Sequence, residues 1–200
     1  MTQRIKSVLT DESRRLFDLL AQSPELEELT LVGGTALALQ INHRISLDFE
    51  FSTFEEKLPA RSIDQLIDWL KAGDNRVNEI ADSNAVSQFK INTGENLRDY
   101  ARDYVINNSK VTFFAHGKNQ KQRQFYKDTA KVKAQEMTFE VLGIDGLKAA
   151  KTLVLADRVR SRDLFDLMVL ARDYAYSLDE IISTQLNTLG ISTTWNTTGP

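Results

Sequence analysis

The spacing of apolar residues along the chain predicts helices and strands up to about residue 142 and helices alone after it. Thr10 precedes the stretch DESRRLFDLLAQS, in which leucines recur at helical spacing, so a capped amphipathic helix is predicted. Ser23-Pro24 then predicts a short helical turn, and residues 60 to 72 repeat the amphipathic pattern. These segments predict helices that pack one face against a core.

Apolar runs that end at turn residues predict the strands. LTLVGG is a short apolar run ending in paired glycines, and the alanines and leucines of TALALQINHR then favour a helix. In SLDFEFS, from residue 46 to 52, alternation with period two predicts a strand whose polar face carries Ser46, Asp48, Glu50 and Ser52. RVNEIAD and AVSQFKINT, between residues 76 and 93, are weaker strand patterns.

The last strands precede a helical region. KVTFFA at 110 to 115 is the clearest late strand, and MTFEVL at 137 to 142 predicts an edge strand. GLKAAKTLVLADRVR and SRDLFDLMVLARDYA predict one broken helix or two adjacent helices, and SLDE at 177 to 180 is a capping box that opens the final helix. We therefore predict an α+β fold, with a mixed region at 1–142, a helical lobe at 143–190 and a frayed tail at 191–200.

Composition narrows the chemistry and the class of protein. The 200 residues are 42% hydrophobic, enough for one domain or two small lobes with a shared interface. Cysteine is absent and histidine occurs twice, so a metal would be bound by carboxylates. The first residues lack the apolar core of a signal peptide, and no stretch approaches the roughly 18 apolar residues of a membrane span. We expect a cytoplasmic protein without a membrane partner.

The formal net charge of −3 gives no overall attraction to nucleic acid, but the segment 110–133 is locally basic. It could contact a polyphosphate or RNA backbone, or it could be an ordinary solvated loop and helix surface. Its seven basic residues stand against the single acid Asp128 and are Lys110, Lys118, Lys121, Arg123, Lys127, Lys131 and Lys133.

Two motifs in the first half suggest a phosphate and metal site. Gly33-Gly34-Thr35 lies between a strand and a helix, where free N–H groups and a hydroxyl can meet a phosphate, although glycines at such corners also serve tight packing. Asp48 and Glu50 lie on one face of a strand, about 6 to 7 Å apart by strand rise. Paired oxygen ligands of this kind suit Mg²⁺ in phosphoryl transfer, and outward acids on a half-exposed strand are the alternative.

A third cluster lies in the helical half. If the helix were continuous, Lys151, Arg158, Arg162 and Asp166 would fall within a sector of roughly 80°. Lysine and arginine would contact phosphates, and Asp163 and Asp166 would orient them or the attacking group. The alternative is a solvated face on which Arg162 and Asp166 form an exposed pair.

Together, VGGTALALQINHRISLDFEF and KTLVLADRVRSRDLFDL resemble the two signature stretches of the AbiEii/AbiGii family of nucleotidyltransferase toxins. The first is similar to the family's Gly-Gly-Thr/Ser-Ala-Leu start, its His-Arg-x-Ser approach (His43, Arg44, Ser46) and its acidic pair. The second is similar to its Lys-x6-Arg-x3-Arg-Asp-x2-Asp helix. The resemblance extends from about residue 28 to 175.

The resemblance implies a nucleotidyltransferase-like palm, with a small mixed sheet flanked by helices, and a helical lobe that completes the site. It also implies Mg²⁺ (or Mn²⁺), an NTP donor, an RNA acceptor such as tRNA or a protein acceptor, and a cognate antitoxin. The implied catalytic residues are Asp48, Glu50, Lys151, Asp163 and Asp166, of which Asp48 and Glu50 bind metal. The implied nucleotide-binding residues are Gly33, Gly34, Thr35, Ser46, Arg158 and Arg162.

Two functions follow as hypotheses. The first is metal-dependent transfer of NMP to an RNA or protein acceptor by the toxin of a toxin–antitoxin or abortive-infection system. The second is a catalytically inactive module of the same fold that binds nucleic acid or a protein. Two departures bear on the choice: the second acid is Glu50 rather than aspartate, and KVTFFA offers Thr112 where many related transferases carry a third carboxylate.

Overall fold

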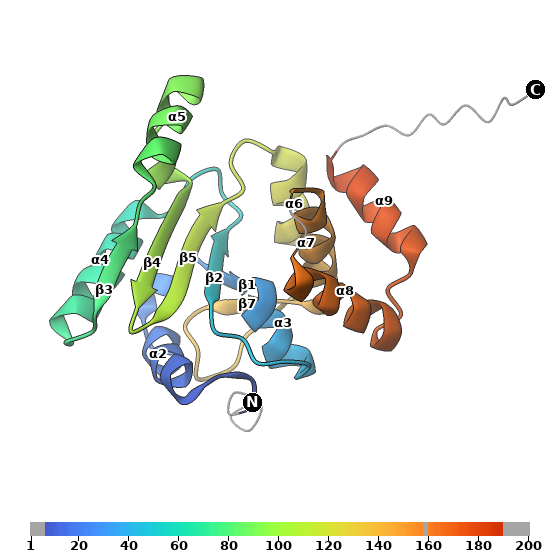
Figure 1. Ribbon diagram of the computed structural model, residues 1–200, viewed down its shortest axis with the longest axis horizontal. Helices are drawn as coiled ribbons and strands as arrows, with labels where there is room; N and C mark the ends of the chain where they lie inside the picture. The colour runs from blue at the N-terminus through green and yellow to red at the C-terminus, as the bar shows by residue number, and fades with distance from the viewer. Residues whose placement is uncertain (1–6, 158–159, 190–200) are drawn as a thin grey trace, which may run out of the picture.

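The protein is described by a computed structural model that covers residues 7 to 157 and 160 to 189. Seven strands in this part of the chain form one mixed sheet in the order β3-β4-β5-β2-β1-β7-β6 (Figure 1). β1 pairs with β7 and β2 with β5 in parallel, and the other neighbours are antiparallel. The strands are β1 (Thr30–Val32), β2 (Phe49–Thr53), β3 (Val77–Ile80), β4 (Ala101–Ile106), β5 (Ser109–Ala115), β6 (Lys131–Val132) and β7 (Glu140–Leu142).

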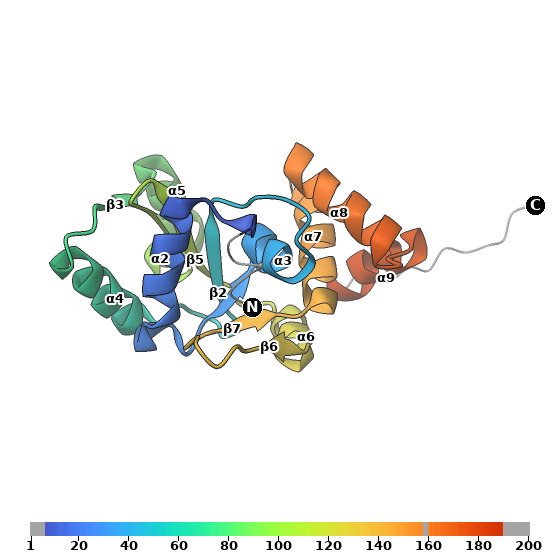
Figure 2. The same ribbon diagram turned by 90° about the horizontal axis from the view of Figure 1, so that it is seen from below.

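Helices lie on both faces of the sheet, as Figures 1 and 2 show: α2 and α4 on one face, and α3, α7 and α8 on the other. The fold is therefore mixed α+β, as predicted. The helices are α2 (Asp11–Ala21), α3 (Gly33–Ile41), α4 (Ala60–Ala72), α5 (Ser83–Thr93), α6 (Gln120–Asp128), α7 (Ile144–Asp157), α8 (Ser161–Asp173) and α9 (Leu178–Leu189), with 3₁₀ turns η1 (Pro24–Leu26) and η2 (Leu97–Asp99).

The core lies between the sheet and the α2–α4 layer and is built on aromatic rings. Phe17 of α2 lies 6.1 Å from Phe49 of β2 between ring centroids, and 6.0 Å from Phe139 in an edge-to-face contact. Phe51 packs on Phe139 at 5.0 Å and on Phe113 of β5 at 5.8 Å. All five rings are buried. Because edge-to-face and offset pairs add to the hydrophobic burial, this cluster fixes β2 and β5 against α2.

Local signals placed several elements where they were predicted. Thr10 caps α2 by accepting a hydrogen bond from the Ser13 N–H at 3.2 Å, and η1 follows Ser23. Ser177 and Glu180 form the reciprocal hydrogen bonds of a capping box ahead of the last helix. These contacts join residues three apart, so a short stretch of sequence determines them.

Two sequence predictions were wrong, and one strand was missed. AVSQFKINT forms helix α5, because Asp82 caps it by accepting from the N–H groups of Asn84 and Ala85. β7 is an interior strand, since β6 covers its outer side. β4 was not predicted, and it pairs with β5 through a tight turn at Asn107 and Asn108, both with positive φ.

The helical half consists of separate helices. α7 packs against α3 and α8, and α9 packs on α7. Arg160, at the N-cap position of α8, has an extended backbone (φ −118°, ψ 143°). The assumed continuous helix from Lys151 to Asp166 is therefore replaced by two adjacent helices. The predicted boundary at residue 142 falls between β7 and α7 and stays a prediction, and the tail at 191–200 lies outside the described residues. In the described ranges no helix is both long and apolar enough to cross a bilayer.

Candidate active site

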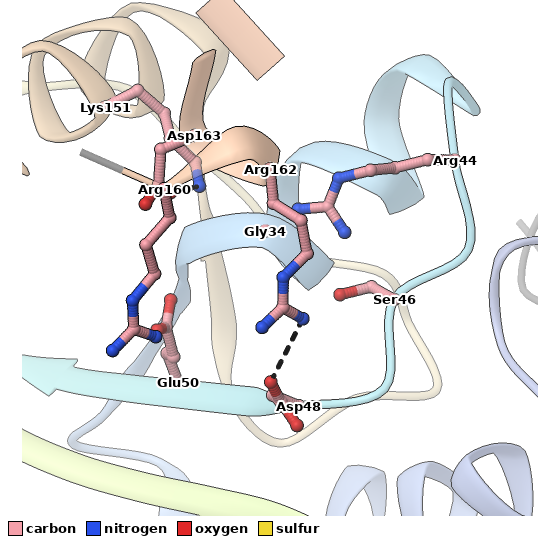
Figure 3. A pocket seen from close by; sticks show the side chains of 9 residues that line it. All are labelled: Gly34, Arg44, Ser46, Asp48, Glu50, Lys151, Arg160, Arg162 and Asp163. Atoms are coloured by element: carbon pink, nitrogen blue, oxygen red, sulfur yellow. Dashed lines mark hydrogen bonds and ion pairs between the residues drawn. The ribbon is translucent and has the colours of Figure 1, made fainter. Parts of the chain in front are cut away.

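A cleft lies where the start of β2 and the start of α3 meet helices α7 and α8 (Figure 3). Every residue that lines it is polar, charged or glycine, a composition suited to a charged ligand. The cleft combines cationic groups from the helical half with carboxylates from the sheet. The lining residues are Gly34, Arg44, Ser46, Asp48, Glu50, Lys151, Arg160, Arg162 and Asp163.

The paired glycines make room for two charged side chains. Gly33 begins α3 with φ +71°, and a Cβ atom there would lie 1.5 Å from Glu50 Oε2. A Cβ at Gly34 would lie 2.4 Å from Arg44 Nη2. The sequence motif was therefore placed correctly, but in this structure the glycines bring Glu50 and Arg44 against the start of α3. Gly34 also lines the cleft, where its backbone is accessible to a ligand.

Thr35 is a positioning group in this structure, whereas a direct contact with the triphosphate was expected. Its side chain is buried, with the residue 1% exposed. Its hydroxyl is hydrogen-bonded to Ser46 Oγ at 2.8 Å and also contacts the Asp48 carbonyl oxygen. These bonds tie the first turn of α3 to the loop that carries Ser46 and Asp48. Ser46 itself lines the cleft.

Asp48 and Glu50 both face the cleft, as their alternation along the chain predicted. The Asp48 side chain is 42% exposed, and its Oδ2 lies 3.5 Å from Arg162 Nη1, the contact dashed in Figure 3. Glu50 and Arg160 both line the cleft. The strand predicted from Ser46 begins only at Phe49, so Asp48 lies in the loop just before β2 and Glu50 lies within β2. These two carboxylates at the start of β2 share the cleft with two arginines at the start of α8.

Asp166 is the centre of a buried ionic network. Its side chain is fully buried, and Arg44 donates to both of its oxygens, from Nε at 2.6 Å and from Nη2 at 2.9 Å. His43 Nε2 lies 2.7 Å from Oδ1, and Lys151 Nζ lies 2.7 Å from Oδ2. Lys151 also bonds Asp163 at 2.9 Å. Asp166 therefore joins the loop before β2 to α7 and α8. It does not line the cleft itself but contacts Arg44 and Lys151, which do.

The network shifts the ionisation of its members. Burial alone would raise the pKa of Asp166, but hydrogen bonds from Arg44 and His43 and the charge of Lys151 outweigh it and hold that pKa well below its usual range. The hydrogen bond to Asp166 in turn raises the pKa of Arg44. A catalytic role was expected for Asp166. Its burial and its occupied oxygens indicate a positioning role instead, whereas Asp163 reaches the cleft.

Two arginines of the cleft had no assigned role in the sequence interpretation. Arg44 belongs to the quoted His-Arg-x-Ser stretch, which was the available signal for it. Arg160 had none, because its position depends on the break between α7 and α8. Arg158 lies outside the described residues. Lys151, Arg162 and Asp163 reach the cleft as expected.

The basic segment 110–133 is largely engaged within the protein. Lys110, Lys118 and Lys127 form ion pairs with Asp103, Glu95 and Glu55, respectively. Lys131 donates to the backbone carbonyls of residues 127 and 129. These contacts favour the interpretation as an ordinary surface over that of a nucleic-acid contact.

The carboxylate pair fits a divalent cation of the Mg²⁺ type. Across residues 7–157 and 160–189, no group of three or more His, Cys, Asp and Glu side chains forms a metal cage. Mg²⁺ is usually held by one or two carboxylates together with substrate phosphates and water, rather than by an all-protein cage. Asp48, just before β2, and Glu50, within β2, supply those two carboxylates in the cleft. The cleft therefore places oxygen ligands of the kind that Mg²⁺ prefers beside arginines of the kind that bind phosphates.

Comparison with solved structures supports a nucleotidyltransferase fold. The chain matches ANT(2")-Ia, solved in complex with adenylyl-2"-tobramycin, with a TM-score of 0.57, 10% identity, and coverage of 90% of this chain and 98% of that one. It also matches a provisionally assigned nucleotidyltransferase from H. pylori, with a TM-score of 0.50, 16% identity, and coverage of 96% and 88%. At these identities the likeness establishes the fold alone.

Sequence comparison establishes the family. The uncharacterized protein aq_aa25 of Aquifex aeolicus (strain VF5) is 25% identical over 174 residues, which are 86% of this chain and 72% of that protein. The family model described as "Nucleotidyl transferase AbiEii toxin, Type IV TA system" matches residues 14–190 and so includes both halves of the cleft. The chain therefore belongs to the AbiEii family of nucleotidyltransferase toxins of type IV toxin–antitoxin systems.

Proposed function

We propose that this cleft binds an NTP with a divalent metal ion and transfers the NMP group to an RNA acceptor. The observation that carries the proposal is the pair Asp48 and Glu50 facing Arg160 and Arg162 across one polar cleft. Carboxylates hold the cation and arginines hold phosphates, and the two sets come from opposite sides. As a type IV toxin, the protein would act on cytoplasmic RNA and be opposed by a cognate antitoxin.

The charges of the cleft support metal dependence. Four lining residues are cationic and three are acidic, and Asp166 adds a further negative charge directly behind them. These charges nearly cancel, so the protein alone offers little net attraction to a triphosphate. A divalent ion on Asp48 and Glu50 restores that attraction. Mg²⁺ at this position would neutralise the triphosphate and stabilise the developing charge on the attacking and leaving oxygens.

The protein's own groups would orient the donor. Arg160 and Arg162 can contact phosphate oxygens in the two-pronged geometry of a guanidinium, and Gly34 lines the same cleft. Lys151 is fixed between Asp163 and Asp166, so it contributes a positioned charge with little freedom to move. Holding the reacting atoms in place in this way supplies much of the catalysis in phosphoryl transfer.

The test is calorimetric titration of the protein with each of the four NTPs, with and without Mg²⁺. We expect saturable, metal-dependent binding that Asp48→Ala weakens at least about 100-fold, because even changes in groups that only support a metal ligand typically cost 10- to 100-fold. Asp145→Ala is the control, since its side chain is 87% exposed on α7 and lies outside the cleft. Equal binding by Asp48→Ala and the wild type would refute the proposal.

A transfer assay then identifies the acceptor class. Each NTP, labelled on the α-phosphate, is incubated with the protein and bulk tRNA, and label retained on RNA is separated from label on protein. We expect labelled RNA in an Mg²⁺-dependent reaction that Asp48→Ala abolishes. Label on protein alone would refute the RNA acceptor while leaving the transferase site intact.

A further inference from the structure

The face of the sheet that carries Glu50 also carries a polar row, which consists of Glu50, Thr112 and Asp103 and runs from the cleft across β5 to β4. In the strand register, Glu50 of β2 pairs with Thr112 of β5, and Thr112 pairs with Asp103 of β4. Residues directly opposite on neighbouring strands project from the same face. Asp103 therefore lies on the face that carries Glu50, about 9 to 10 Å away at two strand spacings.

This part of the face is uncovered. α2 and α4 lie behind the sheet, while α3 packs on β1 and β2 at the front face and α7 packs on α3 (Figures 1 and 2). Thr112 and Asp103 are half-buried, and the neighbouring Lys110 is exposed. Residues of the same strands that point to the other face, such as Phe113 and Tyr104, are buried in the core. A second substrate can thus approach β5 and β4 beside the metal-binding carboxylates.

Asp103 is held in a defined orientation on this surface. Thr112 Oγ1 donates a hydrogen bond to Oδ1 at 2.6 Å, and Lys110 Nζ lies 3.0 Å from Oδ2. Each oxygen of an ionised carboxylate can accept about two hydrogen bonds, so both retain capacity for another donor. The side chain is 35% exposed, which leaves it accessible from the open face.

The other carboxylates of the site already have a proposed metal-binding role or are held in buried ion pairs. Asp48 and Glu50 are the proposed metal ligands, and Asp163 is 5% exposed and bonded to Lys151. Asp166 is fully buried and bonded to Arg44, Lys151 and His43. Transfer to a hydroxyl requires a group that accepts the hydroxyl proton. Asp103 has the chemistry, orientation and access for that task.

We propose that Asp103 binds the acceptor hydroxyl and takes its proton. This inference rests on the proposed function and adds the acceptor side of the same site. The acceptor oxygen forms a bond to the α-phosphorus, the bond from that phosphorus to the bridging oxygen breaks, and pyrophosphate leaves with the electron pair. The hydroxyl proton passes to the Asp103 carboxylate. Thr112, one strand nearer to Glu50, positions Asp103 through its hydroxyl.

The experiment compares Asp103→Asn with Asp99→Asn in the tRNA-labelling assay and in NTP titration. Asp99 is a matched control because it also pairs with a lysine at 3.0 Å, its side chain is also 35% exposed, and it lies outside the cleft. We expect Asp103→Asn to lower the rate of transfer by about 10²- to 10⁴-fold, the usual range for a general base. NTP affinity of both variants should stay within about twofold of the wild type, because the donor side is unchanged.

Thr112→Val provides a second variant that removes only the hydrogen bond to Asp103. We expect transfer to slow about 10- to 150-fold, the rate equivalent of losing one hydrogen bond to a charged group, with NTP affinity unchanged. Transfer by Asp103→Asn within threefold of the wild type overturns the inference, and so does a parallel loss of NTP binding, which would indicate a donor-side role. Absence of NTP binding by the wild type instead refutes the proposed function itself.

Discussion

Replacing Asp166 by asparagine removes one buried charge from the network that joins the two halves of the cleft. The side chain keeps its size, but its amide nitrogen would meet a cationic donor where a carboxylate oxygen had accepted a bond from Arg44 or Lys151. Each charge-assisted hydrogen bond contributes about 1.5–3 kcal/mol. Breaking a buried ion pair by removing one partner typically costs about 3–5 kcal/mol, because the remaining charges stay buried.

We therefore expect Asp166→Asn to lower the free energy of unfolding by about 3–5 kcal/mol at pH 7, out of a total of about 5–15 kcal/mol for a typical domain. Urea denaturation followed by circular dichroism measures this difference, provided the slope against urea is unchanged. Asp173→Asn is the control on the same helix. Its carboxylate pairs with Arg172 and is 42% exposed, so we expect a much smaller loss than for Asp166→Asn, because solvent screens an exposed ion pair.

The pH dependence gives an independent check with a defined sign. The folded-state pKa of Asp166 is depressed, so its contribution is complete above the unfolded value of about 3.9 and is lost as pH falls below that value. The difference in stability between wild type and Asp166→Asn should therefore be constant from pH 7 to pH 5 and shrink below pH 4. A difference under about 1 kcal/mol at pH 7, or one that grows on acidification, would refute the role assigned to this network.

Two further predictions concern other parts of the fold. Gly33→Ala and Gly94→Ala both place alanine at positive φ, which costs about 1–2 kcal/mol, but Gly94 has no neighbour within 4 Å of the added Cβ. Gly33→Ala should therefore also displace Glu50 and abolish metal-dependent NTP binding in calorimetry, and retained binding would contradict the close approach. Burial lowers the pKa of His116 from 6.5 to about 4. Its neutral form therefore contributes fully above pH 6.5, and up to about 3 kcal/mol of stability is lost as pH falls from 6.5 to 4. In urea denaturation, His116→Phe should not show this loss of stability between pH 6.5 and 4. The same pH dependence of stability in His116→Phe and the wild type would contradict the prediction.

Local interactions explain which elements were predictable. The caps at Thr10 and Ser177 and the alternation through Asp48 and Glu50 depend on residues a few positions apart, so they were recognised in the sequence. The α5 segment shows the limit of that approach. Its apolar pattern resembled a strand, but the Asp82 cap favoured a helix, and all of its residues remain partly or fully exposed.

Long-range contacts account for what was missed in the site. Arg160 reaches the cleft because the chain breaks between α7 and α8, and Asp166 becomes buried because α8 packs against the loop that carries His43 and Arg44. Asp103 joins the polar row only through the pairing of β4 with β5. None of these relations has a local sequence signal, since the partners are separated by tens of residues or by a turn of unpredicted geometry.

The sequence by itself determined which chemical groups are available and the two stretches that carry them, VGGTALALQINHRISLDFEF and KTLVLADRVRSRDLFDL. It could do so because helix capping and strand alternation depend on residues close together in the chain. The tertiary structure decided which of those groups face the cleft and which support it. In the low-dielectric interior Asp166 is bonded to Arg44, Lys151 and His43, while strand register left Asp103 accessible on the open face of the sheet. Both residues are aspartates with the same chemistry, and only the packing around them makes Asp166 a buried structural group and Asp103 an accessible one.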